Sequence, residues 1–287
     1  MVSALKGESQ TTNLPAAVAE PLTRRAVLLF DIDGVIRDVS GSYRRAIVET
    51  VHHYSGLRPR AETIDALKAE GCWNNDWQAS LELLRRNGLG TAGQPPLPAF
   101  ADLVEVFNAF YFGGDPEGDP AAWRGFIGAE PLLVERGLFE ALSAAGIAWG
   151  FVSGAEPPSA RFVLQQRLGL VDPPLIAMGE APDKPDPTGL LRLATTLLEP
   201  LALGAEAPPV AYLGDTVADV LTVQRARQQS PEQRFLALAV APPHLQQAAA
   251  SDRRKPYEAQ LLAAGADAVL PSTSSVLAAL QRMLRDC

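Results

Sequence analysis

Short apolar runs alternate with longer segments of helical pattern along most of the chain. The runs are AVLLF (26–30), IAWGFV (147–152), VAYLG (210–214), FLALAV (235–240) and DAVL (267–270), with a weaker candidate around Ile176 in PLIAM. Strands that are apolar at every position are typical of a parallel sheet covered by helices on both faces. The pattern therefore predicts an α/β fold with a doubly wound parallel sheet.

The segment between the first two predicted strands, residues 31–146, is far longer than one crossover helix requires. Within it, three stretches place apolar residues at helical spacing. They are Tyr43, Ala46, Ile47, Val51 and Tyr54 up to Gly56, then Trp77, Leu81 and Leu84 up to Gly88, then Phe100, Leu103, Val104, Phe107 and Tyr111. We predict an all-helical insert over residues 41–128, with hinges near Ser40-Gly41 and within 125–128.

The rest of the chain divides into a core and a leader. Residues 24–40 and 129–287 carry the predicted strands and are assigned to the α/β core. Residues 1–23 lack the continuous apolar region of a signal peptide, so they are interpreted as a flexible polar leader. No run in the sequence reaches the roughly twenty apolar residues that a membrane span requires, and no membrane association is expected.

Charge and metal-ligating residue types exclude several classes of protein. The net charge is −8 and the arginine pairs are scattered, which argues against a nucleic-acid surface. Cys72 and Cys287 lie outside any metal-ligand spacing, so we expect neither a disulfide scaffold nor a zinc site, and a reduced, cytoplasmic protein. His52, His53 and His244 have no neighbouring carboxylate or cysteine at metal-ligand spacing, and we assign them no metal.

Carboxylates follow two of the predicted strands directly. Asp31 and Asp33 come after the first strand, and Asp215 follows the third, with Asp219 four residues on. The carboxyl ends of parallel strands meet at one edge of a sheet, so we expect these side chains to meet there. Buried carboxylates side by side repel one another unless a cation or a proton compensates them. The cluster therefore indicates a metal site or a catalytic site.

Four short motifs in chain order extend this cluster. They are FDIDGV, FVSGAE, DKPDP and GDTVAD, and they add Ser153, Gly154 and Lys184 to the same edge. The set resembles the four ordered motifs of the haloacid dehalogenase-like (HAD) superfamily, in particular the phosphatase branch of subfamily I. Members of that subfamily have a Rossmann-like core and a helical cap inserted after the first motif. The resemblance covers residues 24–40 and 131–287, and the position of the insert.

The resemblance implies a Mg²⁺-dependent phosphatase that hydrolyses a small phosphomonoester, such as a sugar phosphate or phosphoglycolate, through an aspartyl-phosphate. Asp31 would be the nucleophile, and Asp33 the general acid and later the base. Mg²⁺ would be held by the side chain of Asp31, the backbone carbonyl of Asp33 and the carboxylate of Asp215. Asp219 would support Asp215 or touch the metal through water.

The phosphate group would be bound by the other motif residues. Ser153 offers a hydroxyl and Gly154 an unobstructed backbone N–H, both of which can donate to phosphoryl oxygens. Lys184 would stabilise the same oxygens with its positive charge and hold Asp31. Gly34 lets the chain turn sharply beside the phosphate.

Other functions remain open for the same residues. A phosphomutase of the β-phosphoglucomutase type would keep both aspartates and differ in its cap, whereas a dehalogenase does not need Asp33. A non-catalytic protein of this fold would bind a phosphorylated ligand without turning it over. The substrate and the oligomeric state stay undetermined.

The insert contains one polar stretch, GCWNNDWQ, that fits two interpretations. Asn74, Asn75 and Asp76 have the side chains of substrate-reading residues. Asn75 followed three residues later by Gln78 also fits the N-terminal cap of a helix. The sequence favours neither interpretation.

Overall fold

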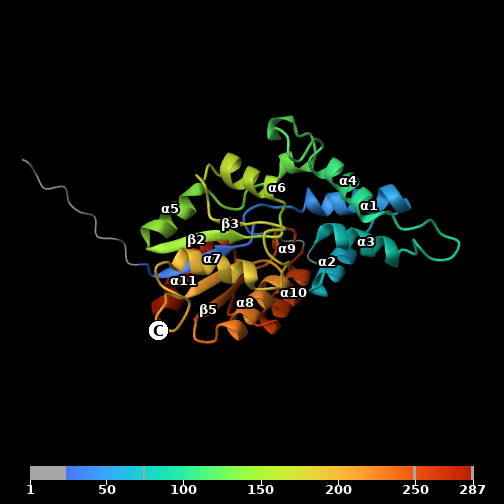
Figure 1. Ribbon diagram of the computed structural model, residues 1–287. Helices are drawn as coiled ribbons and strands as arrows, with labels where there is room; N and C mark the ends of the chain where they lie inside the picture. The colour runs from blue at the N-terminus through green and yellow to red at the C-terminus, as the bar shows by residue number, and fades with distance from the viewer. Residues whose placement is uncertain (1–23, 74, 248–249, 286–287) are drawn as a thin grey trace, which may run out of the picture.

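The computed structural model describes residues 24–73, 75–247 and 250–285, so the predicted leader lies outside the described residues. Within them, one sheet of six parallel strands has the order β3-β2-β1-β4-β5-β6 (Figure 1). The strands are β1 (Ala26–Phe30), β2 (Ile147–Val152), β3 (Leu175–Ile176), β4 (Val210–Gly214), β5 (Phe235–Val240) and β6 (Ala268–Leu270). The predicted α/β class is confirmed, and every predicted strand is present, the weak candidate at Ile176 as a short edge strand.

Helices fill the connections between the strands. Between β1 and β2 lie α1 (Tyr43–Ser55), α2 (Ala61–Ala69), α3 (Asp76–Arg86), α4 (Phe100–Tyr111), the 3₁₀ turns η1 (Pro120–Ala122) and η2 (Phe126–Ala129), and α5 (Arg136–Ala144). After β2 come α6 (Pro157–Arg161), the π-helical η3 (Phe162–Arg167), α7 (Thr188–Leu198), α8 (Val217–Gln229), α9 (Pro243–Gln246), α10 (Ser251–Ala263), η5 (Thr273–Ser275) and α11 (Val276–Arg285).

The sheet has a hydrophobic core on each face because its strands are apolar on both sides. In β1, Leu28 and Phe30 pack with α5, η3 and α11, while Val27 and Leu29 pack with α7, α8 and α10. All five residues of β1 are fully buried. Successive side chains of β1, the strand between β2 and β4, point to opposite faces of the sheet, and both faces are covered. Every position of β1 is therefore apolar.

Helices α1 to α4 have a third hydrophobic cluster of their own. Tyr43, Ile47 and Val51 of α1 pack there with residues of α3 and α4, including Phe107. Figure 1 shows these helices as a layer beyond the sheet, on the side where α9 and α10 lie. The three predicted helical faces correspond to α1, α3 and α4, whereas α2 was not predicted. Only two apolar residues of α2 are buried, which is too narrow a stripe for a periodicity signal.

The two linkers that join these helices to the sheet run side by side. The N–H of Asp38 donates to the carbonyl of Pro131 at 2.8 Å, and the N–H of Leu133 donates to the carbonyl of Ile36 at 2.8 Å. Arg37 and Leu132 form an antiparallel bridge between those two bonds. The chain therefore leaves the core and returns to it at one place, close to the predicted hinges.

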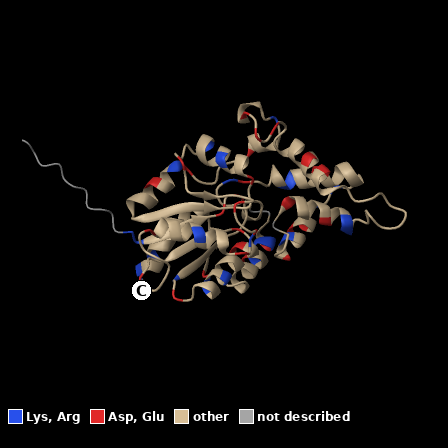
Figure 2. Ribbon diagram, viewed as in Figure 1, with Lys and Arg blue, Asp and Glu red and all other residues tan. Residues whose placement is uncertain are grey.

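Charge is distributed over both layers. Figure 2 shows lysine and arginine on helices of the sheet region and of α1 to α4, interspersed with acidic residues. Among the described residues, no helix has the length and apolar character needed to cross a bilayer.

Candidate active site

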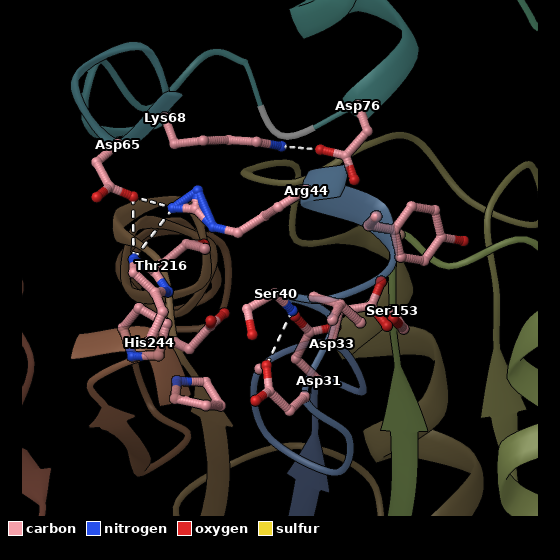
Figure 3. Close-up of a pocket in the computed structure, with 18 of the residues that line it drawn as sticks. Asp31, Asp33, Ser40, Arg44, Asp65, Lys68, Asp76, Ser153, Thr216 and His244 are labelled. Atoms are coloured by element: carbon pink, nitrogen blue, oxygen red, sulfur yellow. Dashed lines mark hydrogen bonds and ion pairs between the residues drawn. The ribbon is translucent and has the colours of Figure 1, made fainter. Parts of the chain in front are cut away.

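A pocket of about 120 Å³ lies between the carboxyl edge of the sheet and the first helices. Its lining includes Asp31, Asp33, Gly34, Ser153, Gly154, Lys184 and Asp215. In Figure 3, Arg44, Lys68 and Asp76 lie on the opposite side of the pocket from Asp31. The structure thus brings together residues from β1, β2, β4 and the loop before α7, as the parallel topology predicts.

Lys184 is buried between two carboxylates. Its Nζ lies 3.1 Å from Asp31 Oδ1 and 2.5 Å from Asp219 Oδ1, and it donates to the Tyr212 hydroxyl at 3.1 Å. Burial opposes the charged form, but Asp219 and Asp31 outweigh it and raise the pKa of Lys184 well above its usual value. The lysine therefore stays charged beside Asp31.

Asp219 fixes this lysine and also starts a helix. It forms a capping box with Thr216 at the beginning of α8, in which each side chain bonds the other's backbone N–H. Its side chain is 1% exposed. Although burial opposes ionisation, Lys184 and Thr216 hold the pKa of Asp219 below its ordinary value. A Cβ at Gly214 would lie 2.2 Å from the Cβ of Asp219, so this approach requires glycine at the end of β4.

Three carboxylates meet where a cation is expected. Asp31, Asp215 and Asp219 each offer an oxygen within 4.8 Å of the others, and all three are buried. Burial raises the pKa of Asp31 to about 6, and burial together with Asp219 and Asp31 raises the pKa of Asp215 well above its ordinary value. Among the described residues, the one ion pair of Asp31 is the one with Lys184. One lysine does not balance three carboxylates, so this donor set fits a hard divalent cation.

Gly34 permits the first motif to approach Asp215. Its φ is 76°, in the left-handed region, and a Cβ there would lie 1.9 Å from Asp215 Oδ2. Both the conformation and the contact exclude a side chain. The turn after Asp33 therefore has to be glycine for the two carboxylate-bearing strands to share a site.

Asp33 is held by an arginine that the sequence analysis did not single out. Arg37 Nε donates to Asp33 Oδ1 at 2.6 Å, and Arg37 Nη1 lies 3.0 Å from Glu130 Oε2. The Arg37 side chain is fully buried, and the Asp33 side chain is 26% exposed. The detectable signal was an arginine inside an apolar stretch, four residues after Asp33.

The wall contributed by the first helices is ionic. Arg44 of α1 pairs with Asp65 of α2, and Lys68 pairs with Asp76. His244 Nε2 lies 3.0 Å from Asp65 Oδ1 and 3.1 Å from Arg44 Nη2, joining this wall to the loop after β5. These contacts of His244 could not be predicted from its sequence neighbours, because its partners are remote along the chain. Burial and Arg44 lower the pKa of His244 to about 3, so it is neutral at physiological pH.

The polar stretch of the insert divides between the two interpretations. The side chain of Asn75 accepts from the N–H of Gln78 at 3.0 Å and caps α3. Asp76 lines the pocket and is paired with Lys68. Asn74 lies outside the described residues.

Comparison with known proteins identifies the family. The profile of haloacid dehalogenase-like hydrolases matches residues 26–227, which is most of the chain. The chain belongs to this family of hydrolases, and the resemblance of the four motifs is confirmed. The match includes β1, β2 and β4, and with them Asp31, Ser153, Lys184 and Asp215.

Individual relatives cover different shares of the chain. A protein of Phytophthora nicotianae named imidazoleglycerol-phosphate dehydratase is 33% identical over 201 residues, which are 69% of this chain and 41% of that protein. A phosphonoacetaldehyde hydrolase-like protein from Oleispira antarctica has a TM-score of 0.66 at 17% identity, covering 95% of this chain and 97% of that one. Phosphatase Tt82 from Thermococcus thioreducens has a TM-score of 0.52 at 23% identity, covering 73% and 91%. Both of these solved structures have the same fold as this chain.

Proposed function

We propose that this protein is a Mg²⁺-dependent phosphatase that hydrolyses a small phosphomonoester through an aspartyl-phosphate. The observation that carries the proposal is the position of Asp31. One oxygen lies 3.1 Å from the buried ammonium of Lys184, and the same carboxylate belongs to the three-carboxylate cluster with Asp215. A carboxylate can attack an anionic ester only where positive charge neutralises both partners, and Lys184 together with a cation at the carboxylate cluster would supply that charge.

The chemistry proceeds in two steps on the chain's own residues. In the first, a carboxylate oxygen of Asp31 forms a bond to phosphorus, the bond from phosphorus to the alcohol oxygen breaks, and Asp33 donates its proton to that oxygen. In the second, Asp33 takes a proton from water, whose oxygen attacks phosphorus. Inorganic phosphate leaves and the Asp31 carboxylate is restored. Lys184 holds Asp31 in place and stabilises charge on the phosphoryl oxygens in both steps.

The other residues bind the phosphoryl group and the metal. The Ser153 hydroxyl accepts from the N–H of Ala155 at 3.2 Å, which leaves its own proton to donate, and Gly154 offers a backbone N–H. Mg²⁺ would be held by the side chains of Asp31 and Asp215 and the backbone carbonyl of Asp33. When bound, it supplies positive charge that polarises the phosphoryl oxygens.

Residues 41–128 are proposed as the cap of this site. The pocket lining from α1, α2 and α3 supports this division, because Arg44, Asp65 and Trp77 face the motif residues across the pocket. A cap in this position excludes bulk water and contacts the leaving alcohol. Free, exposed Cys72 supports a reducing, cytoplasmic location.

The test is phosphate release from a panel of phosphomonoesters, with Mg²⁺ and with a chelator, for the native chain and for Asp31→Asn. Because the Phytophthora relative is named for imidazoleglycerol phosphate, the panel includes a phosphorylated imidazole alcohol besides sugar phosphates and phosphoglycolate. Asp252→Asn, an exposed change on α10, is the matched control.

Each outcome selects one function. Release that requires Mg²⁺, disappears in Asp31→Asn and persists in Asp252→Asn supports the phosphatase. Isomerisation of a sugar phosphate without net release of phosphate would identify a phosphomutase. Binding of esters without either reaction would identify a non-catalytic protein that recognises phosphorylated ligands.

A further inference from the structure

Two buried polar groups line the pocket without hydrogen-bond partners. Glu156 immediately precedes α6, is 9% exposed, and its Oε2 has no partner in the described structure. Tyr43 is the first residue of α1 and is 5% exposed, and its hydroxyl lies near Ser159 and Glu156 without a hydrogen bond of good geometry. Both residues line the pocket that contains Asp33. Burying such groups without partners costs free energy, so we expect a ligand group to supply the missing hydrogen bonds.

The surroundings hold both side chains in place. The Tyr43 ring is stacked on Tyr111, with ring centroids 4.0 Å apart, and the Arg37 guanidinium lies 5.5 Å from its centroid. Glu156 Oε1 accepts from Asn108 Nδ2 of α4 at 3.4 Å. Glu156 is also only three residues beyond Ser153, the proposed phosphate ligand. Both side chains are therefore held in fixed positions in the lining of the pocket that contains Asp33.

The charges of this region leave carboxylates in excess. The two cations of the helical wall are each paired, Arg44 with Asp65 and Lys68 with Asp76. Glu156 and Asp38, which also line the pocket, form no ion pair within the described part of the chain. This excess of negative charge would repel a second anionic group on a substrate and would attract a cationic group.

We propose that Glu156 and Tyr43 form the leaving-group subsite and select phosphomonoesters whose alcohol carries a protonated nitrogen, either an amine or an imidazolium. The nitrogen donates to Glu156 Oε2 and to the Tyr43 hydroxyl, which accepts. Trp77 also lines this pocket and offers an aromatic surface of the kind that favours cations. This inference rests on the proposed phosphatase function and specifies its substrate class.

The ionisation of Glu156 agrees with this assignment. Burial raises the pKa of Glu156 to about 7, since Asn108 and the distant Arg37 compensate its charge only in part. A cation bound at Oε2 would stabilise the carboxylate form. A neutral alcohol would leave this buried charge uncompensated.

The test uses three series of alkyl phosphates of two to four carbons that end in an amine, a hydroxyl or a carboxylate. We expect kcat/KM for the amino series to exceed that of the hydroxyl series of equal length by about tenfold to a hundredfold, as for hydrogen bonds to charged groups. The carboxylate series should be the poorest. Glu156→Gln should remove most of the preference, and Tyr43→Phe should reduce it, while Glu140→Gln on the surface of α5 keeps it.

Binding to Asp31→Asn, measured by calorimetry with the same esters, separates this inference from the proposed function. Hydrolysis of all three series without preference for the amine would overturn the subsite while the phosphatase stands. A preference that survives in Glu156→Gln would overturn the assignment to Glu156. If the native chain hydrolyses no ester but Asp31→Asn binds the amino series selectively, the phosphatase fails and the subsite stands.

Discussion

The guanidinium of Arg37 fixes the carboxylate of Asp33, with Nε 2.6 Å from Oδ1. Arg37 is itself anchored by Glu130, which also accepts from the Tyr111 hydroxyl at 3.1 Å. With Oδ1 engaged, the other oxygen of Asp33 is the one left for the proton transfer that we propose. Arg37 is therefore a positioning residue for Asp33, contributed by the linker that leads from the core to the helices.

Arg37→Lys tests this positioning. The variant keeps a positive charge near Glu130 but loses the Nε–Oδ1 bond, so Asp33 is no longer fixed. We expect single-turnover release of an alkyl alcohol to slow by about a hundredfold, the scale of an approximately 1 Å misplacement. Release of p-nitrophenol should slow much less, because that leaving group departs without a proton. Equal losses for both esters, at an unchanged melting temperature, would contradict the positioning role.

Asp215→Asn should separate metal binding from folding. The substitution removes one of three mutually repelling buried carboxylates, so the melting temperature without metal is expected to match or exceed that of the native chain. Saturating Mg²⁺ should stabilise the native chain, by about 2.7 kcal/mol at a hundredfold excess over Kd, and leave the variant unchanged. Scanning calorimetry with and without Mg²⁺ measures both effects, with Asp252→Asn as the control. Equal stabilisation of the variant by Mg²⁺ would place the metal elsewhere.

Glu156 should make the free protein less stable at alkaline pH. Its folded pKa, about 7, is above the ordinary value of 4.5, so the folded state holds a proton that the unfolded state has already released. The resulting stability is present at acid pH and is lost as pH rises through 7. Glu156→Gln lacks this dependence. When the free energies of unfolding of the two proteins are set equal at pH 4.5, we expect the variant to be more stable than the native chain at pH 8 by roughly 1 to 3 kcal/mol.

Urea unfolding at both pH values, without substrate or metal, provides the measurement. A variant that is less stable than the native chain at pH 8 would mean that the Glu156 carboxylate has a structural partner in solution. It would also weaken the case for a ligand at that oxygen.

Gly34 and Gly56 form a matched pair for testing close approach at the site. Both have positive φ, 76° and 71°, but a Cβ at Gly56 would meet nothing within 4 Å. Gly56→Ala should cost about 1 kcal/mol of stability and leave kcat unchanged. Gly34→Ala carries the same backbone strain and also displaces Asp215, so kcat should fall by about a hundredfold or more. Similar kcat values for the two variants would show that Asp215 does not need this approach.

The sequence predicts much of this fold because local patterns carry the information. Strands such as Ala26–Phe30 are apolar on both faces, and α1 and α4 have wide apolar stripes, so each period is visible without the tertiary structure. Asp31, Lys184 and Asp215 come together because parallel strands end at one edge. The roles proposed for these residues remain predictions, since geometry alone does not test them.

The contacts that the sequence did not reveal depend on how the helices pack on the core. His244 meets Asp65 and Arg44 across separations of 179 and 200 residues. In the sequence, Arg37 is only a charged residue within an apolar stretch. Its partner Glu130 belongs to the returning linker and is remote along the chain. Glu156, like Ser153, lies shortly after a strand. The sequence does not show that one of its oxygens lacks a partner, because this depends on how α1 and α4 pack around it. A side chain whose partners belong to another layer of the fold produces no periodic pattern in the sequence around it.

The paired linkers at Arg37 and Leu132 also bear on how proteins of this architecture diversify. The two linkers are joined by two backbone hydrogen bonds, Asp38 to Pro131 and Leu133 to Ile36, which use no side-chain atoms. Bonds of this kind do not depend on which side chains the intervening stretch carries. Under the proposed function, selection could act on the choice of alcohol through one contiguous block of the gene, separately from the motif residues of the core.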